Sequence, residues 1–133
     1  MINFKKYCLV LGVLVALLVP ALVANAEMMS VTGKITGFTC LTRGYICPID
    51  KADPMVNLEK DFVLVTASGE YYFMPNISIG LKARHALEVV TVSGDVNAKY
   101  KSIKVSTMSV GGKEVYSKAA EDKMFEELNK PAP

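Results

Sequence analysis

One long apolar run near the N-terminus separates the start of this chain from the part that is expected to fold. It extends from about Tyr7 to Val23, follows the pair Lys5-Lys6 and precedes Ala24-Asn25-Ala26. A basic start, an apolar segment and a small-x-small site form the pattern of a secretory signal peptide. We therefore expect a signal over residues 1–26, with cleavage before Glu27. The alternative is a retained anchor, because the run approaches the roughly 18 to 20 residues that a membrane-spanning helix needs.

Removing this segment changes the charge of the part that folds. The full chain has 15 basic and 13 acidic residues. Lys5 and Lys6 precede the cleavage site and no acidic residue does, so 13 of each remain. A neutral surface has no general attraction for nucleic acid, which depends on clustered cations. We expect a periplasmic or secreted protein with no nucleic-acid partner and no stable membrane anchor after cleavage.

The cysteines agree with an oxidising compartment. Cys8 falls within the expected signal, so the exported chain keeps Cys40 and Cys47. An even pair in a secreted domain most simply forms one disulfide. A redox pair is usually spaced Cys-x-x-Cys near a helix start, whereas this pair has six residues between its members, in a proline-bearing loop with no evident helix start. We predict a structural disulfide, and keep a redox or metal-binding role for the two cysteines as an alternative.

Short apolar segments separated by turn residues predict a mainly β domain. The expected strands are Val31–Phe38, Asp61–Thr66, Tyr71–Met74, Glu88–Val96 and Ser102–Val110, with a long loop from Thr39 to about Glu59.

Three further features complete the expected order of elements. A short helix capped by Asn76 or Ser78 should lie between the third and fourth strands. A bulge near Ser106 and Thr107 would reconcile the apolar residues of the fifth strand. After a short added strand from Lys113 to Tyr116, Ser117 can cap a final helix.

Three strands, a short helix and two more strands follow the order of the OB-fold, a five-stranded, partly open Greek-key barrel. The segment Val90–Val96 followed by Ser102–Val105 resembles the fourth and fifth strands of that fold. The chain is also similar to small periplasmic bacterial OB-fold proteins that pair a signal peptide with a lone barrel. This resemblance covers Val31 to Val110. It implies an OB-like barrel, and we place that domain over residues 27–116. The expected C-terminal helix and tail over 117–133, like the cysteine loop, depart from the family's pattern.

Patterns that carry catalysis are missing from the sequence. There is no Gly-x-Ser-x-Gly turn and no phosphate-binding Gly-x-x-x-x-Gly-Lys. His85 is the one histidine, so a nucleophile would have a single candidate base and a zinc site too few ligands. We therefore expect neither an enzyme nor a bound metal or cofactor.

The aromatic strand is the best candidate for a binding surface. Along a strand, Tyr71 and Phe73 point to one face and Tyr72 and Met74 to the other. In an OB-fold the second and third strands carry the usual ligand face, where outward aromatics would stack on a ring or on a partner's side chain. The alternative is that both faces are covered.

The leading hypothesis is a noncatalytic module that binds an unidentified protein or small-molecule partner. Its candidate binding residues are Arg43, Tyr45, Tyr71 and Tyr72, which join the cysteine loop to the aromatic strand. A competing hypothesis is an assembly subunit of an envelope complex. It would dock through the stripe of Met124, Phe125 and Leu128 on the final helix.

Overall fold

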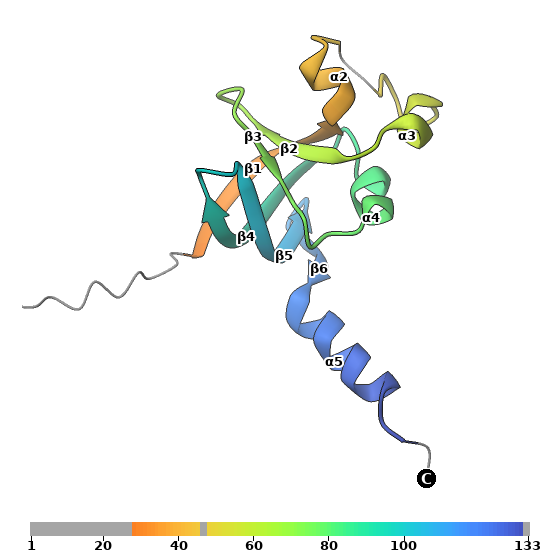
Figure 1. Ribbon diagram of the computed structural model, residues 1–133, viewed down its shortest axis with the longest axis vertical. Helices are drawn as coiled ribbons and strands as arrows, with labels where there is room; N and C mark the ends of the chain where they lie inside the picture. The colour runs from red at the N-terminus through yellow and green to blue at the C-terminus, as the bar shows by residue number, and fades with distance from the viewer. Residues whose placement is uncertain (1–27, 46–47, 132–133) are drawn as a thin grey trace, which may run out of the picture.

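The computed structural model describes residues 28–45 and 48–131. The expected signal, residues 1–26, and Cys47 lie outside the described residues. Within them the chain forms six strands and four helices (Figure 1). In chain order these are β1 (Met28–Gly37), α2 (Phe38–Thr42), α3 (Met55–Leu58), β2 (Phe62–Thr66), β3 (Tyr71–Phe73), α4 (Ile79–Arg84), β4 (Val89–Asn97), β5 (Ser102–Val110), β6 (Lys113–Ser117) and α5 (Lys118–Leu128).

The strands form one sheet in the order β3-β2-β1-β4-β5-β6, and consecutive neighbours in this order are antiparallel. β1 pairs with β4 through Met28–Lys34 and with β2 through Gly33–Gly37. Gly33 belongs to both pairings, and a Cβ there would lie 2.5 Å from the Val65 carbonyl oxygen. Only glycine allows this close approach of two backbones. The prediction of a mainly β domain with a C-terminal helix is confirmed.

The end of β3 also meets β5, in a parallel pairing. Phe73 is the partner of Ser102, and the Phe73 N–H donates to the Lys101 carbonyl oxygen at 2.8 Å. Beyond β3, the Asn76 side chain continues this connection. Its Nδ2 donates to the Val105 carbonyl oxygen at 2.7 Å, and its Oδ1 accepts from the Val105 N–H at 2.8 Å. Asn76 therefore joins β3 to β5, and Ser78 is the residue that caps α4.

The hydrophobic core lies on the inner face of this sheet and is closed by the segment around α4. It consists of Ile35, Phe62, Leu64, Met74, Ile77, Ala86, Val90, Val92, Ile103, Val105 and Met108. The predicted bulge in β5 explains how the last three all reach it. Ser93 pairs with Thr107 and Gly94 with Val105, so Ser106 is the extra residue. The bulge is confirmed.

A buried lysine fixes α4 to the sheet. Lys82 is 3% exposed and forms an ion pair with Asp61, which immediately precedes β2. Burying a charge is costly unless it is paired. The pairing therefore places α4 over one end of the core.

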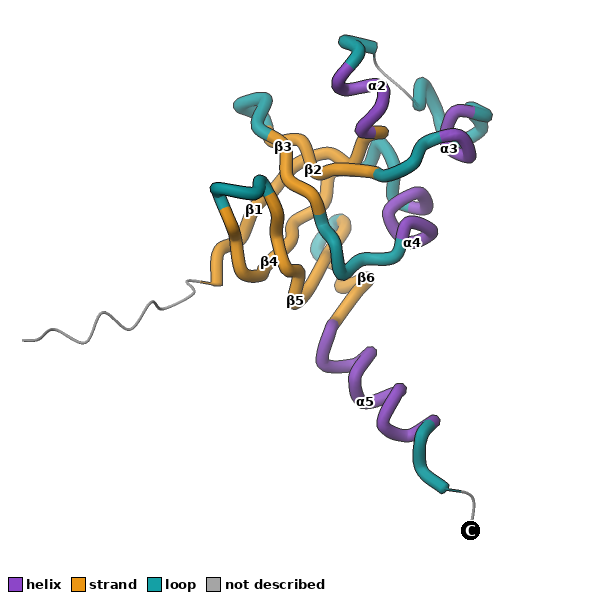
Figure 2. The backbone as a smooth tube through the Cα atoms, viewed as in Figure 1, coloured by secondary structure: helices purple, strands orange, loops and turns teal. Residues whose placement is uncertain are grey.

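α5 extends away from the sheet (Figure 2). Ser117 caps it, as predicted, by accepting a hydrogen bond from the Ala120 N–H at 3.5 Å. Met124, Phe125 and Leu128 are 53%, 52% and 71% exposed. The expected apolar stripe therefore stands in solvent. Among the described residues, no helix combines the length and apolar character required to cross a membrane.

Candidate binding face

The hairpin of β2 and β3 sends alternate residues to opposite faces of the sheet. Leu64 and Tyr72 are strand partners, and both belong to or pack against the core. Val65 and Tyr71 are partners on the opposite side. We call this side the outer face and define it by Lys34, Thr36, Val63, Val65, Tyr71 and Phe73. The alternation of residues along the strand predicted that Tyr71 and Tyr72 face opposite sides, yet both were proposed as binding residues. Because Tyr72 packs against the core, it does not belong to the outer face.

Three aromatic rings meet on the outer face: Phe38, Tyr71 and Phe73. The Phe38 ring centroid lies 4.8 Å from that of Phe73 and 5.8 Å from that of Tyr71, and the last two are 6.0 Å apart. These separations are typical of attractive aromatic pairs. Val63, the strand partner of Phe73, is fully buried, whereas Val65 and Tyr71 remain partly exposed. One end of the outer face is therefore covered and the other is open.

Phe38 is positioned by a helix that the sequence analysis missed. α2 follows β1 directly, and its N-cap residue, Gly37, has no side chain that could cap it. The Glu59 carboxylate serves instead. It accepts from the Thr39 N–H at 3.0 Å and from the Cys40 N–H at 3.2 Å. A helix start needs such acceptors for its first N–H groups.

The expectation of a loop from Thr39 to about Glu59 is confirmed for residues 43–45 and 48–54 but was wrong for the residues of α2 and α3. For α2 the reason is a capping group that lies far away in the sequence. The acceptor that allows α2 to start is 20 residues away from Thr39 in the sequence. Gly37 is also required at this point, because a Cβ there would lie 2.5 Å from the Glu59 Cδ. A local search for capping residues therefore finds no helix start. A second short helix, α3, lies in the same segment.

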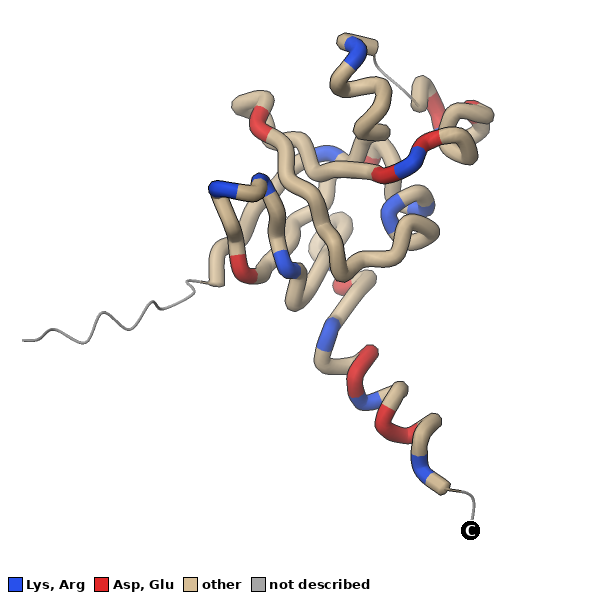
Figure 3. The backbone as a smooth tube through the Cα atoms, viewed as in Figure 1, with Lys and Arg blue, Asp and Glu red and all other residues tan. Residues whose placement is uncertain are grey.

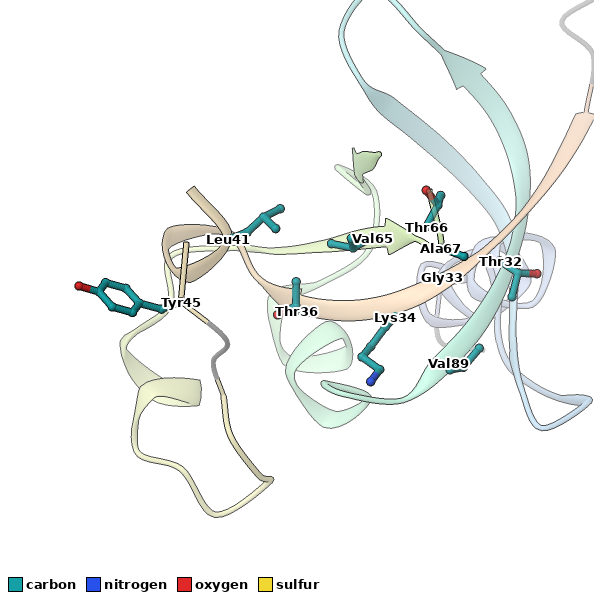
Figure 4. A pocket seen from close by; sticks show the side chains of 10 residues that line it. All are labelled: Thr32, Gly33, Lys34, Thr36, Leu41, Tyr45, Val65, Thr66, Ala67 and Val89. Carbon is teal, nitrogen blue, oxygen red and sulfur yellow. The ribbon is translucent and has the colours of Figure 1, made fainter. Parts of the chain in front are cut away.

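The other predicted site residues lie at or beyond the end of α2. Arg43 is its C-cap residue and is exposed. Tyr45 is 70% exposed, and its ring points away from the neighbouring side chains (Figure 4). Cys40 is buried within α2. Because Cys47 lies outside the described residues, the Cys40–Cys47 disulfide stays a prediction.

The turn between β4 and β5 brings positive charge to the aromatic rings. The Lys101 Nζ lies 5.3 Å from the centroid of the Tyr71 ring, within cation–π range. β3 itself has no charged residue, whereas this turn is basic (Figure 3). A cation therefore borders the open end of the outer face.

A pocket of about 480 Å³ lies on the outer face beside the aromatic rings (Figure 4). Its lining residues come from β1, β2, the start of β4 and the α2 segment. They are Thr32, Gly33, Lys34, Thr36, Leu41, Tyr45, Val65, Thr66, Ala67 and Val89. This volume is within the range of about 300 to 1,000 Å³ that is usual for small-molecule sites. Val65 lines the pocket and is the strand partner of Tyr71, so the pocket and the rings are adjoining parts of one surface.

The strand register explains this continuity. Val89, Lys34, Val65 and Tyr71 are successive partners across β4, β1, β2 and β3. They form one row across four strands. Lys34 is the charged member of the pocket lining, and it forms no ion pair within the part of the chain that the structure describes.

A small polar network holds the loop near the pocket. Glu88 forms an ion pair with Lys51, and its Oε2 lies 2.7 Å from the His85 Nδ1. Hydrogen bonds from Lys51 and His85 lower the pKa of Glu88. The Glu88 carboxylate therefore joins Lys51, in the loop before α3, to His85 and to the start of β4.

The outer face presents several kinds of side-chain groups. It offers apolar contact, ring stacking, threonine and tyrosine hydroxyls and positive charge. No histidine or carboxylate is among the pocket-lining residues, and no group of three potential metal ligands occurs in 28–45 and 48–131. Comparisons with protein-family models, with curated proteins and with solved structures found no match to this chain.

Proposed function

We propose that this protein is an exported, noncatalytic binding module built on an OB-type barrel, and that the outer face is its binding surface. The ligand is a small molecule or a segment of a protein partner. The observation that carries the proposal is the outer face itself. It brings together the partly exposed Tyr71 ring on β3, a pocket of small-molecule size, Lys34 on β1 and Lys101 in the β4–β5 turn, at or beside the second and third strands that OB-folds use for ligands.

The barrel is supported by the strand pairings. Neighbouring strands pair in the order β3-β2-β1-β4-β5. The parallel pairing of Phe73 with Ser102 then joins β5 back to β3. The bidentate hydrogen bonds of Asn76 with Val105 strengthen this link. α4, between β3 and β4, has the place that the helix of an OB-fold takes.

Export and the disulfide rest on the sequence. The basic, apolar and small-residue pattern of residues 1–26 supports a signal peptide. An oxidising compartment would then favour the Cys40–Cys47 bond. That bond would restrain the segment carrying α2, which forms one wall of the pocket.

A thermal-shift screen with a library of small aromatic and aliphatic fragments tests the binding proposal. We expect a subset of fragments to raise the melting temperature of the wild type, since a ligand that binds only the folded state stabilises it. Tyr71→Ala should remove most of these shifts. Tyr100→Ala is the matched control, because Tyr100 is 67% exposed and lies in the β4–β5 turn rather than on the outer face.

Two outcomes would contradict the proposal. One is that no fragment stabilises the wild type. The other is that Tyr71→Ala and Tyr100→Ala retain the same set of shifts, which would locate binding elsewhere.

A second candidate function is docking to an apolar groove on an envelope protein through α5. The supporting observation is the exposed stripe of Met124, Phe125 and Leu128 on a helix that stands away from the sheet. Deletion of residues 118–133 should leave the melting temperature nearly unchanged while abolishing complex formation. Unfolding of the truncated protein would instead indicate that α5 is part of the domain, and unchanged complex formation would rule out docking through it.

A further inference from the structure

The pocket on the outer face is lined by Lys34, whose ammonium group forms no ion pair with any residue in 28–45 or 48–131. We propose that the pocket binds a small organic anion, a carboxylate with an apolar body, and that Lys34 binds the carboxylate. This inference rests on the proposed binding function of the outer face and specifies its ligand class.

The surroundings of Lys34 carry the argument about charge. Its partners across the sheet are Val65 and Val89, and its neighbours along the same face of β1 are Thr32 and Thr36. None of these can neutralise an ammonium group. An incoming anion can therefore form a charge-assisted hydrogen bond with Lys34 without displacing an internal ion pair.

The hydroxyl groups nearby are already engaged in part. The Thr32 Oγ1 is 2.9 Å from the Thr91 Oγ1, and the Thr66 Oγ1 is 2.8 Å from the Ser68 Oγ. Lys34 is consequently the strongest available donor in the pocket. This favours an anion over a neutral polyol, which would need several free donors and acceptors.

The remaining lining residues indicate an apolar body. Leu41, Val65, Ala67 and Val89 line the same pocket. In Figure 4 the Lys34 side chain leaves β1 on the side of Val89, whereas Val65 and Leu41 lie on the other side of β1. A ligand held at one end by Lys34 can thus cover Val65 and approach Leu41 with its apolar part.

The number of charges favours a small molecule over an acidic protein surface. A protein partner recognised by charge would need several cations on this lining, and the described residues supply one. The volume of about 480 Å³ also suits a single small ligand.

Two dyes that differ in charge test the inference on the purified protein. 1-Anilinonaphthalene-8-sulfonate is an anion, and N-phenyl-1-naphthylamine has the same ring system without the sulfonate. We expect the anionic dye to bind at least about fivefold more tightly, which is the scale of one charge-assisted contact. Octanoate should displace it, and methyl octanoate, which has no charge, should displace it much less.

Three substitutions identify the charge involved. Lys34→Met keeps an unbranched side chain but removes the ammonium group. It should lower the affinity for the anionic dye about tenfold and change the affinity for the neutral dye less than about twofold. Lys34→Arg should restore most of the affinity. Lys113→Met, at an exposed lysine on β6, is the control and should leave both dyes unchanged.

The outcomes separate this inference from the proposed function. If both dyes bind equally and Lys34→Met alters neither, the pocket binds ligands but the carboxylate assignment is wrong. If a peptide with several acidic residues displaces the anionic dye and octanoate does not, the small-molecule assignment is wrong. If neither dye binds the folded protein, the pocket is not a ligand site, and the proposed function fails with the inference.

Discussion

The two faces of the β2–β3 hairpin are built from alternating residues of the same two strands, yet they differ in what covers them. On the inner face, Phe62 and Leu64 are fully buried in the core. On the outer face, Val63 is fully buried, but Val65 and Tyr71 stay partly exposed beside a pocket. Folding requires the inner face to be apolar. It does not require the open aromatic surface on the outer side, so that surface is the better candidate for function.

The largest expected effect distinguishes the two faces by their contribution to stability. Leu64→Ala should lower the free energy of unfolding by about 2 to 5 kcal/mol, because it leaves a cavity in a packed core. Val65→Ala, at the next position, should cost less than about 1 kcal/mol, because its side chain is partly exposed. Urea unfolding of both variants measures the difference. Equal losses would contradict the contrast between the faces.

The second prediction concerns the support of the outer face. Glu59→Ala removes the acceptor for two N–H groups at the start of α2 and should cost about 1 to 3 kcal/mol. Amide exchange at Thr39 and Cys40 should accelerate, while exchange at Leu64 should stay slow, because local opening of α2 need not open the core.

Glu70→Ala is the matched control, since Glu70 is an exposed residue before β3. It should leave exchange in α2 unchanged. Slow exchange at Thr39 in Glu59→Ala would mean that α2 does not depend on this cap.

A third, smaller effect concerns the cation beside Tyr71. Lys101 has φ = 45°, which asparagine tolerates better than most residues. Lys101→Asn should therefore keep the turn and remove only the cation–π contact, at a cost of about 0.5 to 1 kcal/mol. Urea unfolding measures this cost. A loss as large as that of Leu64→Ala would show that the turn supports the core.

The smallest effect is a pH dependence at Glu88. Its pKa is lowered below the ordinary value of 4.5 by hydrogen bonds from Lys51 and His85. A lowered pKa in the folded state stabilises the protein above the ordinary value, and this contribution disappears as the pH falls through the folded-state pKa. Glu88→Gln should thus be slightly less stable than the wild type at neutral pH. The two should converge below about pH 4.5 in urea midpoints measured across this range, whereas a constant gap would contradict the assignment.

The sequence predicted the strands well because each is a short apolar or aromatic segment bounded by turn residues. It also predicted that Tyr71 and Tyr72 would face opposite ways, since alternation is a local property. It could not decide which tyrosine faces inward. Both faces of the segment are apolar, and the pairing of Leu64 with Tyr72 decides the question.

The part of the site around α2 depends on contacts between distant residues. Gly37 gives no sign of a helix start, and Glu59 supplies the cap from the other end of the loop. Phe38 was therefore placed at the end of a strand and not recognised as a member of the aromatic cluster. Lys34 gained significance only from its strand partners, because an isolated lysine in a strand is ordinarily a solvated residue.

The most direct test of the outer face as the binding surface is an NMR titration of ¹⁵N-labelled protein with 1-anilinonaphthalene-8-sulfonate. We predict that the largest amide shifts occur at Lys34, Leu41, Val65 and Tyr71, and that α5 and β6 shift little. Shifts concentrated at Met124, Phe125 and Leu128, with the outer face unchanged, would contradict the account and locate the binding surface on α5.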